Sequence, residues 1–200
     1  MGQRIHKGDV AFRIAFKTAF IYDQKEKEMA ETLTTLKNRR SCRAYKPELI
    51  EEDKLNAIIE AGTYAATGMG KQSPIIIAVT DKAVRDKLSK MNAAVMGAEI
   101  DPFYGAPEVL IVLANKAVPT YLYDGSLVLG NMMNAAADLG VASCWIHRAK
   151  EEFESEEGKA ILKELGIEGD YEGIGHLILG YSPAPAPEAA PRKSNYVYRI

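Results

Sequence analysis

Apolar residues recur from residue 29 onward, at helical spacing in some segments and in short continuous runs in others. The helical spacing predicts helices over residues 29–39, 52–65, 81–91, 123–139 and 151–165. The continuous runs predict strands over residues 75–79, 109–114, 141–146 and 174–179, and a strand-like tail over residues 196–200. The run from Ile75 to Val79 is apolar on both faces, which is typical of strands inside a sheet. We therefore predict an α/β or α+β domain built around a sheet of four or five strands.

The predicted helix over residues 123–139 is apolar on nearly all sides and contains Gly125, Gly130 and several alanines. A helix of this kind must be buried, and its small residues let neighbouring elements approach closely. Packing in the core of one chain and burial between two chains both explain the pattern.

Residues 1–28 have a different pattern. Apolar positions alternate from Val10 to Phe16, but Arg13 and Lys17 interrupt the run, so it lacks the unbroken apolar segment of a secretory signal. The segment could form a strand or a partner-binding arm, or it could be an extension upstream of a domain that starts at Met29. We favour the extension, and we expect the folded domain to span residues 29–200.

The composition excludes several classes of protein. The 200 residues include 25 Lys and Arg and 27 Asp and Glu, which gives a formal net charge of −2. General nucleic-acid binders are normally basic, so we expect no nucleic-acid partner. No uninterrupted apolar run reaches the ~18 residues of a membrane-spanning helix, so we expect no membrane partner.

Cysteine and histidine are sparse and scattered. Cys42 and Cys144 lie far apart and cannot build a disulfide framework, and with His6, His147 and His176 they form no spaced zinc-binding set. We therefore predict no metal site and a reducing, cytoplasmic compartment. We expect His176, in the middle of a predicted strand, to be a core histidine with satisfied hydrogen bonds.

The strongest local signal for a ligand is a basic segment directly after the first predicted helix. Arg39, Arg40 and Arg43 lie within five residues of one another and enclose the hydroxyl of Ser41. Guanidinium groups bind phosphate bidentately and stay charged at working pH, so the segment suits an anion. A solvated basic helix end is the alternative, because cations offset the negative end of a helix dipole. The glycine-rich phosphate-binding motifs and the common hydrolase motifs are absent, so side chains must hold any phosphate.

These features together resemble the flavin-dependent nitroreductase family. The matching motifs are the Arg-Arg-Ser segment, the loop that ends near Gln72, the long apolar helix, a strand that ends in Cys-Trp-Ile-His, and a basic residue before a short C-terminal strand. The resemblance covers residues 29–200. It implies an α+β, nitroreductase-like fold with a mostly antiparallel sheet of four to five strands flanked by helices. It also implies a homodimer, with the C-terminal tail swapped onto the second subunit and FMN bound at the interface.

The resemblance also implies roles for individual residues. Arg39 and Ser41 would hold the FMN phosphate, with Arg192 and Lys193, and Arg40 would lie alongside. Arg43 would reach the pyrimidine edge of the flavin ring, where a fixed cation stabilises the reduced form. Asn92 would hydrogen-bond the same ring, and the turn Trp145-Ile146-His147 would place a backbone N–H at flavin N5. Contacts from the partner subunit would come from Ala66, Thr67, Met69 and, in the same loop, Gln72.

Two departures from the family pattern concern this site. The loop lacks the usual asparagine and tryptophan, and Ser194 stands where a second basic residue is usual, so that Lys193 must replace it.

The implied activity is reduction of nitroaromatics, quinones or flavins by NADH or NADPH in a ping-pong scheme. The flavin carries this chemistry, so no catalytic side chain is required, although Arg43 and His147 could modulate it. The alternatives are another flavin reaction on the same scaffold, such as dehydrogenation or dehalogenation, and a non-catalytic flavin- or anion-binding dimer.

Overall fold

The computed structural model describes residues 31–200. Residues from Arg39 to Ile200 form one compact unit, and residues up to Asn38 belong to another, whose described part is a helix over residues 31–38. The predicted extension over residues 1–28 lies outside the described residues.

One antiparallel sheet organises the larger unit. Its strands are β1 (Pro74–Val79), β2 (Glu108–Asn115), β3 (Ala142–Ile146) and β4 (Tyr171–Gly180). They lie in the order β1-β2-β4-β3, and each neighbouring pair is antiparallel. The predicted α+β architecture with a four-stranded antiparallel sheet is therefore confirmed.

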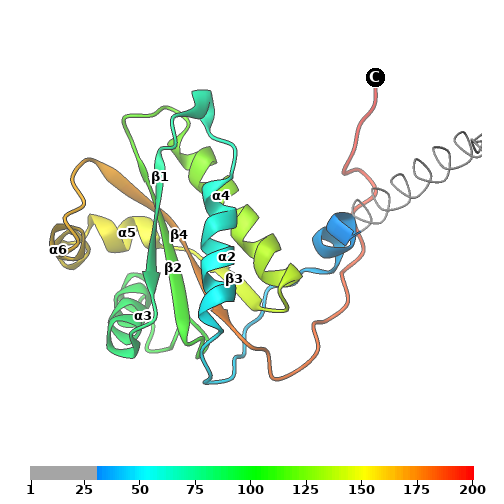
Figure 1. Cartoon of the computed structure of the whole chain (residues 1–200), viewed down its shortest axis with the longest axis horizontal. Coiled ribbons are helices and arrows are strands. Elements are labelled where there is room, and N and C mark those ends of the chain that lie inside the picture. Colours follow the sequence, from blue (N-terminus) through cyan, green and yellow to red (C-terminus); the bar gives the residue numbers. More distant parts are fainter. Residues whose placement is uncertain (1–30) are drawn as a thin grey trace, which may run out of the picture. The chain divides into compact units, whose positions relative to one another are not determined.

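Helices cover both faces of this sheet (Figure 1). The helices are α2 (Glu52–Thr63), α3 (Lys82–Met96), α4 (Tyr121–Asp138), α5 (Ala149–Glu154) and α6 (Glu156–Glu164). Side chains of β2 alternate between two buried clusters: Leu110 and Val112 pack with α2 and α4, whereas Val109 and Ile111 pack with α3 and α5. The central strands β2 and β4 are thereby buried on both sides.

The expectation that Ile75–Val79 is an interior strand was wrong. β1 is the edge of the sheet next to β2, and Ile75, Ile76 and Ile77 are only half-buried. An edge strand between two helical layers needs apolar residues on both faces too, so periodicity does not separate the two positions.

The single helix expected over residues 151–165 is two helices. Ser155 has an extended backbone, and its hydroxyl accepts a hydrogen bond from the N–H of Gly158 at 3.1 Å. The serine therefore ends α5 and caps α6. α3 in turn runs beyond the predicted end at residue 91 and stops where Gly97 adopts a left-handed conformation.

The helix α4 is not buried on all sides within the single chain. Val128, Leu129 and Met132 face the core, but Tyr123 and Leu127 are 73% and 49% exposed. An added Cβ on Gly130 would meet nothing within 4 Å. The chain by itself therefore covers only one side of this apolar helix.

The C-terminal tail forms no strand in the single chain. Residues 183–200 are exposed throughout, and no strand includes residues 196–200. A strand needs a neighbour for its N–H and C=O groups, and within residues 31–200 the tail is paired with none. The predicted swap onto a second subunit stays a prediction.

Candidate functional site

The basic segment is joined to the free edge of the sheet. Ser41 forms a parallel bridge with Ser143 of β3, and the N–H of Cys42 donates to the carbonyl of Ser143 at 2.9 Å. Because the pairing is parallel, the chain from Ser41 to Arg43 runs toward the same end of the sheet as the chain from Ser143 to Trp145. The structure therefore brings together two motifs that lie a hundred residues apart.

Arg39 provides the clearest sign of a ligand. Its Nη1 atom is buried and has no hydrogen-bond partner within the described residues. A buried guanidinium N–H without an acceptor is costly, and an anionic oxygen would remove that cost. Arg40 donates from Nη1 to the carbonyl of Arg39. The chemistry of Arg39 therefore fits an anionic group such as a phosphate, and the predicted contribution of the Ser41 hydroxyl stays a prediction.

The end of β3 presents a turn with one exposed side chain. Trp145 packs against the core beside Gly175, where an added Cβ would lie only 2.3 Å from the indole nitrogen. Ile146 is buried in the opposite cluster, and His147 is exposed. The side chain of Trp145 therefore belongs to the core, and any ligand contact from these first two residues would have to come mainly from the backbone.

Asn92, predicted to contact the flavin ring, is fully buried and already hydrogen-bonded. Its Nδ2 donates to the carbonyl of His147 at 2.8 Å and to Glu152, and its Oδ1 accepts from Nε of Arg148 at 2.9 Å. In this structure Asn92 holds the turn after β3. A direct contact between Asn92 and a ring stays a prediction.

His176 is a core histidine as expected, but its hydrogen bonds are not satisfied. Neither ring nitrogen has a hydrogen-bond partner within the described residues. The carboxyl Oε2 of Glu152 lies 3.3 Å from Nε2 of His176, and both side chains are fully shielded from solvent. The expectation of satisfied hydrogen bonds was therefore wrong: Glu152 comes within ion-pair distance of the ring without forming a hydrogen bond to it.

The loop over residues 66–73 is held by Asp124 at the start of α4. Its carboxylate accepts hydrogen bonds from the N–H of Gly68 at 2.9 Å and from the hydroxyls of Ser73 and Thr120 at 2.8 and 3.1 Å. Thr67 accepts from the N–H of Gln72 at 3.1 Å. Asp124 is thus the anchor of this loop.

The same loop contains backbone strain and exposed side chains. Met69 and Gln72 have φ angles of 54° and 48°, which non-glycine residues seldom adopt. Ala66, Met69 and Gln72 are exposed. Such strain persists only where the surroundings over-determine it, and it is concentrated at ligand sites.

Replacing Asp124 with asparagine is expected to lower the free energy of unfolding by about 1.5–3 kcal/mol at neutral pH, because charged hydrogen bonds are lost in a buried place. Burial alone would raise the pKa of this carboxyl, but the hydrogen bonds from Gly68, Ser73 and Thr120 outweigh burial and hold its pKa below the ordinary value. The stabilisation is therefore present above the unfolded-state pKa of about 3.9 and is lost as the pH falls through the lower, folded-state pKa.

Denaturant unfolding between pH 7 and pH 3 tests this expectation. The difference between wild type and Asp124→Asn should be constant at neutral pH and shrink in acid. Asp170→Asn, which removes an exposed pair with Lys116, should cost much less than Asp124→Asn, because solvent screens this pair. A difference that grows in acid would contradict the assignment.

The two basic residues of the tail contact only their own segment in the single chain. Arg192 donates from Nε and Nη2 to the carbonyl of Ala190, and the ammonium of Lys193 lies 5.4 Å from the centre of the Tyr196 ring. Their predicted role at the phosphate stays a prediction.

Three residues of this region were not among the candidates from the sequence. Asp124 had a signal, since it is an acidic residue in an otherwise apolar helix. Glu152 and Arg148 had none, because an acidic residue in a predicted amphipathic helix and a basic residue in a turn are ordinary surface features.

Within residues 31–200, no group of three or more His, Cys, Asp or Glu side chains could hold a metal ion. In that same part of the chain, none of the helices combines the length and apolar character that crossing a bilayer requires.

Comparison with known proteins gives one family match and several structural matches. Residues 36–110 match the nitroreductase family. An FMN-bound nitroreductase from Bacteroides fragilis is 30% identical, with 85% of this chain and 98% of that chain covered at a TM-score of 0.77. An FMN-bound nitroreductase from Desulfitobacterium hafniense is 26% identical, with the same coverage and a TM-score of 0.76.

A more distant structure shares the fold. Iodotyrosine deiodinase bound to FMN and 3-iodo-L-tyrosine is 17% identical, with 84% of this chain and 99% of that chain covered at a TM-score of 0.68. No curated protein sequence matches the chain.

Proposed function

Because this chain belongs to the nitroreductase family, we propose that it is an FMN-dependent oxidoreductase that uses NADH or NADPH to reduce electron-poor acceptors such as nitroaromatics, quinones or flavins. The observation that carries the proposal is the buried Nη1 of Arg39, which has no hydrogen-bond partner among residues 31–200 and belongs to a basic segment fixed to the edge of the sheet at β3. A glycine-rich loop is not needed when guanidinium groups supply the anion site.

The chain's own residues would bind and orient the cofactor. Arg39 and Ser41 would hold the phosphate, and Arg43, further along the same segment, would place a cation near the ring. When bound, FMN would supply two-electron hydride chemistry between the nicotinamide donor and the acceptor. The protein's part is to fix geometry and charge, and the exposed His147 is not required as an acid.

The proposal includes a cytoplasmic homodimer with the cofactor between its subunits. The exposed apolar stripe on α4 at Tyr123, Leu127 and Gly130 supports it, because a second copy would cover these residues. The strained loop with Met69 and Gln72 would then face the cofactor of the other subunit. The tail would pair with the partner's sheet and deliver Arg192 and Lys193.

The absorbance spectrum of the purified protein tests the proposal. The protein should be yellow, and NADH or NADPH should bleach the flavin bands. A nitroaromatic acceptor should then restore them with steady turnover. A colourless protein that takes up no added FMN would refute the proposal. Bound FMN without bleaching would indicate a non-catalytic binder, and bleaching without nitroaromatic turnover another flavin reaction.

A further inference from the structure

A chain of buried polar groups runs from the core to the turn after β3. It starts at His176 on β4, passes through Glu152 on α5 and Asn92 on α3, and ends at His147 and Arg148. Three separate elements contribute to it. The hydrogen-bonded part of it extends from Glu152 through Asn92 to the turn, and paired groups of this kind rigidify what they touch.

Asn92 is the junction of this network. Its amide donates twice, to the His147 carbonyl and to Glu152, and accepts once from Arg148. A carboxylate could not donate to these two acceptors, and an apolar side chain would leave a buried carboxylate without its partner. An amide is therefore the group that this position requires.

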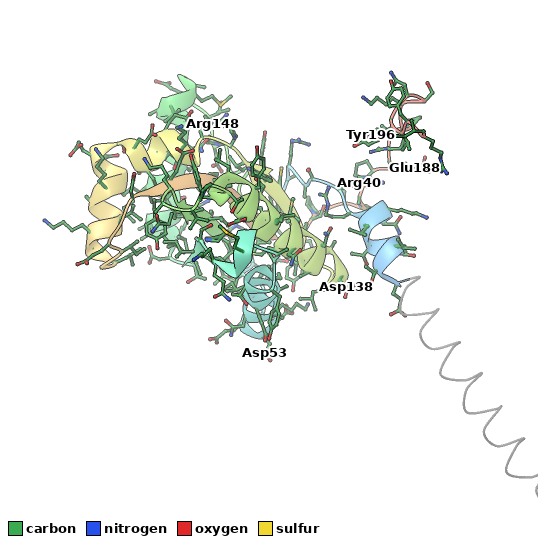
Figure 2. The ribbon with its side chains drawn as sticks, turned by 90° about the horizontal axis from the view of Figure 1, so that it is seen from above. Arg40, Asp53, Asp138, Arg148, Glu188 and Tyr196 are labelled. Atoms are coloured by element: carbon green, nitrogen blue, oxygen red, sulfur yellow. The ribbon has the colours of Figure 1, made fainter. Side chains whose placement is uncertain are left out.

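Arg148 shows why the turn needs such support. Its φ angle is 78°, a left-handed conformation that costs a non-glycine residue free energy, and it lies at the start of α5 (Figure 2). Three contacts hold it: its Nε is fixed by Asn92, the preceding carbonyl is fixed by the same amide, and its own carbonyl accepts from the N–H of Glu152 at 3.1 Å.

Glu152 supports Asn92 from the inside. The residue is 1% exposed, and its Oε1 accepts a hydrogen bond from Asn92. Its Oε2 lies 3.3 Å from Nε2 of His176 but has no hydrogen-bond partner among the described residues, so Asn92 is the partner that this carboxylate depends on. A residue used only for packing would not need a charge here, because apolar side chains of similar volume fill such sites at no greater cost.

We propose that Glu152, acting through Asn92, is the positioning residue that holds the His147–Arg148 turn in the conformation in which its backbone meets the flavin ring. The inference rests on the proposed function, since it names what sets the geometry of that site. It assigns Asn92 and Glu152 an indirect role: neither needs to contact the cofactor.

Amide hydrogen exchange of the full chain without FMN tests whether Glu152 and Asn92 hold the turn. Asn92→Ala should speed exchange of the amides of residues 146–150 at least tenfold relative to the β2 amides. Glu152→Gln, which keeps the shape of the side chain and replaces the carboxylate with an amide, should speed exchange of the same amides by a smaller factor. It replaces Asn92→Ala as the test if that variant does not fold. Ser89→Ala is the matched control, because Ser89 is also buried on α3 but donates to Asp101. It should leave these amides unchanged.

The two-electron reduction equilibrium of the FMN-loaded protein tests whether the held turn meets the flavin ring. Both variants should change its equilibrium constant at least tenfold, or about 30 mV, with less than a threefold change in FMN affinity, because the phosphate is held elsewhere. Ser89→Ala should shift neither quantity.

Each remaining outcome counts against the inference. Unchanged exchange in both variants overturns it whether or not FMN binds. Faster exchange with an unchanged reduction equilibrium also overturns it, because the network would then hold the turn for folding alone. A wild-type protein that binds no FMN refutes the proposed function, and with it the role of the turn toward the flavin.

Discussion

Replacing Arg39 with alanine is expected to weaken FMN binding by about 1.5–3 kcal/mol, or roughly 10- to 150-fold. The reason is that the buried Nη1 of Arg39 has no acceptor in the part of the chain that the structure describes, so its hydrogen bond to a phosphate oxygen would be charged and shielded from water. Titration of the FMN-free protein with FMN, followed by flavin fluorescence, measures the change.

Two further variants distinguish a specific contact between Arg39 and the phosphate from a general effect of positive charge on FMN affinity. Arg39→Lys keeps the charge and loses the planar fork, so it should recover only part of the affinity. Lys82→Ala removes one cation from an exposed pair with Asp86 on α3 and should leave FMN affinity within about twofold. Equal losses in Arg39→Ala and Lys82→Ala would place the phosphate elsewhere.

Replacing Leu127 with arginine is expected to abolish the proposed dimer and, with it, FMN retention. Leu127 is 49% exposed on α4, so the single chain should tolerate the change and fold. In an interface the same side chain would bring an unpaired charge into an apolar contact, at an effective cost of several kcal/mol. This corresponds to at least a hundredfold weaker association. Sedimentation analysis gives the assembly state, and absorbance gives the bound flavin.

Leu165→Arg is the matched control for the interface. Leu165 has a similar exposure of 53% but lies at the end of α6, outside the stripe of Tyr123, Leu127 and Gly130. This variant should keep both dimer and flavin. A Leu127→Arg protein that remains dimeric would exclude this face as the interface, and a monomer that retains FMN would exclude a shared cofactor site.

The sequence predicted the described helices and strands well wherever each run of apolar residues corresponded to a single helix or strand. It could not place β1 at an edge, because helices on both faces demand the same residues at an edge strand as at an interior one. It also missed the break at Ser155, since the amphipathic pattern continues across a single capping residue. Both failures concern contacts between elements, which periodicity does not encode.

The residues of the candidate site also fall into two groups, those that the local sequence indicates and those whose role depends on long-range contacts. The Arg39–Arg43 segment could be proposed from the sequence because its chemistry is local, and the structure pairs it with the Trp145–His147 segment through the Ser41–Ser143 bridge. The role of Asn92 could not be derived from spacing, because its partners Glu152 and Arg148 lie about sixty residues away. Long-range hydrogen bonds between single side chains leave no periodic trace.

Asp124 has a consequence for how this protein could change its acceptor range. One carboxylate fastens the exposed loop of Met69 and Gln72 to the helix that carries the stripe of Tyr123, Leu127 and Gly130. Remodelling the loop for a bulkier molecule would therefore tilt or shift that helix, and adjusting the helix would move the loop. Directed evolution toward new acceptors should accumulate paired changes, one in the loop and one on α4, more often than isolated ones.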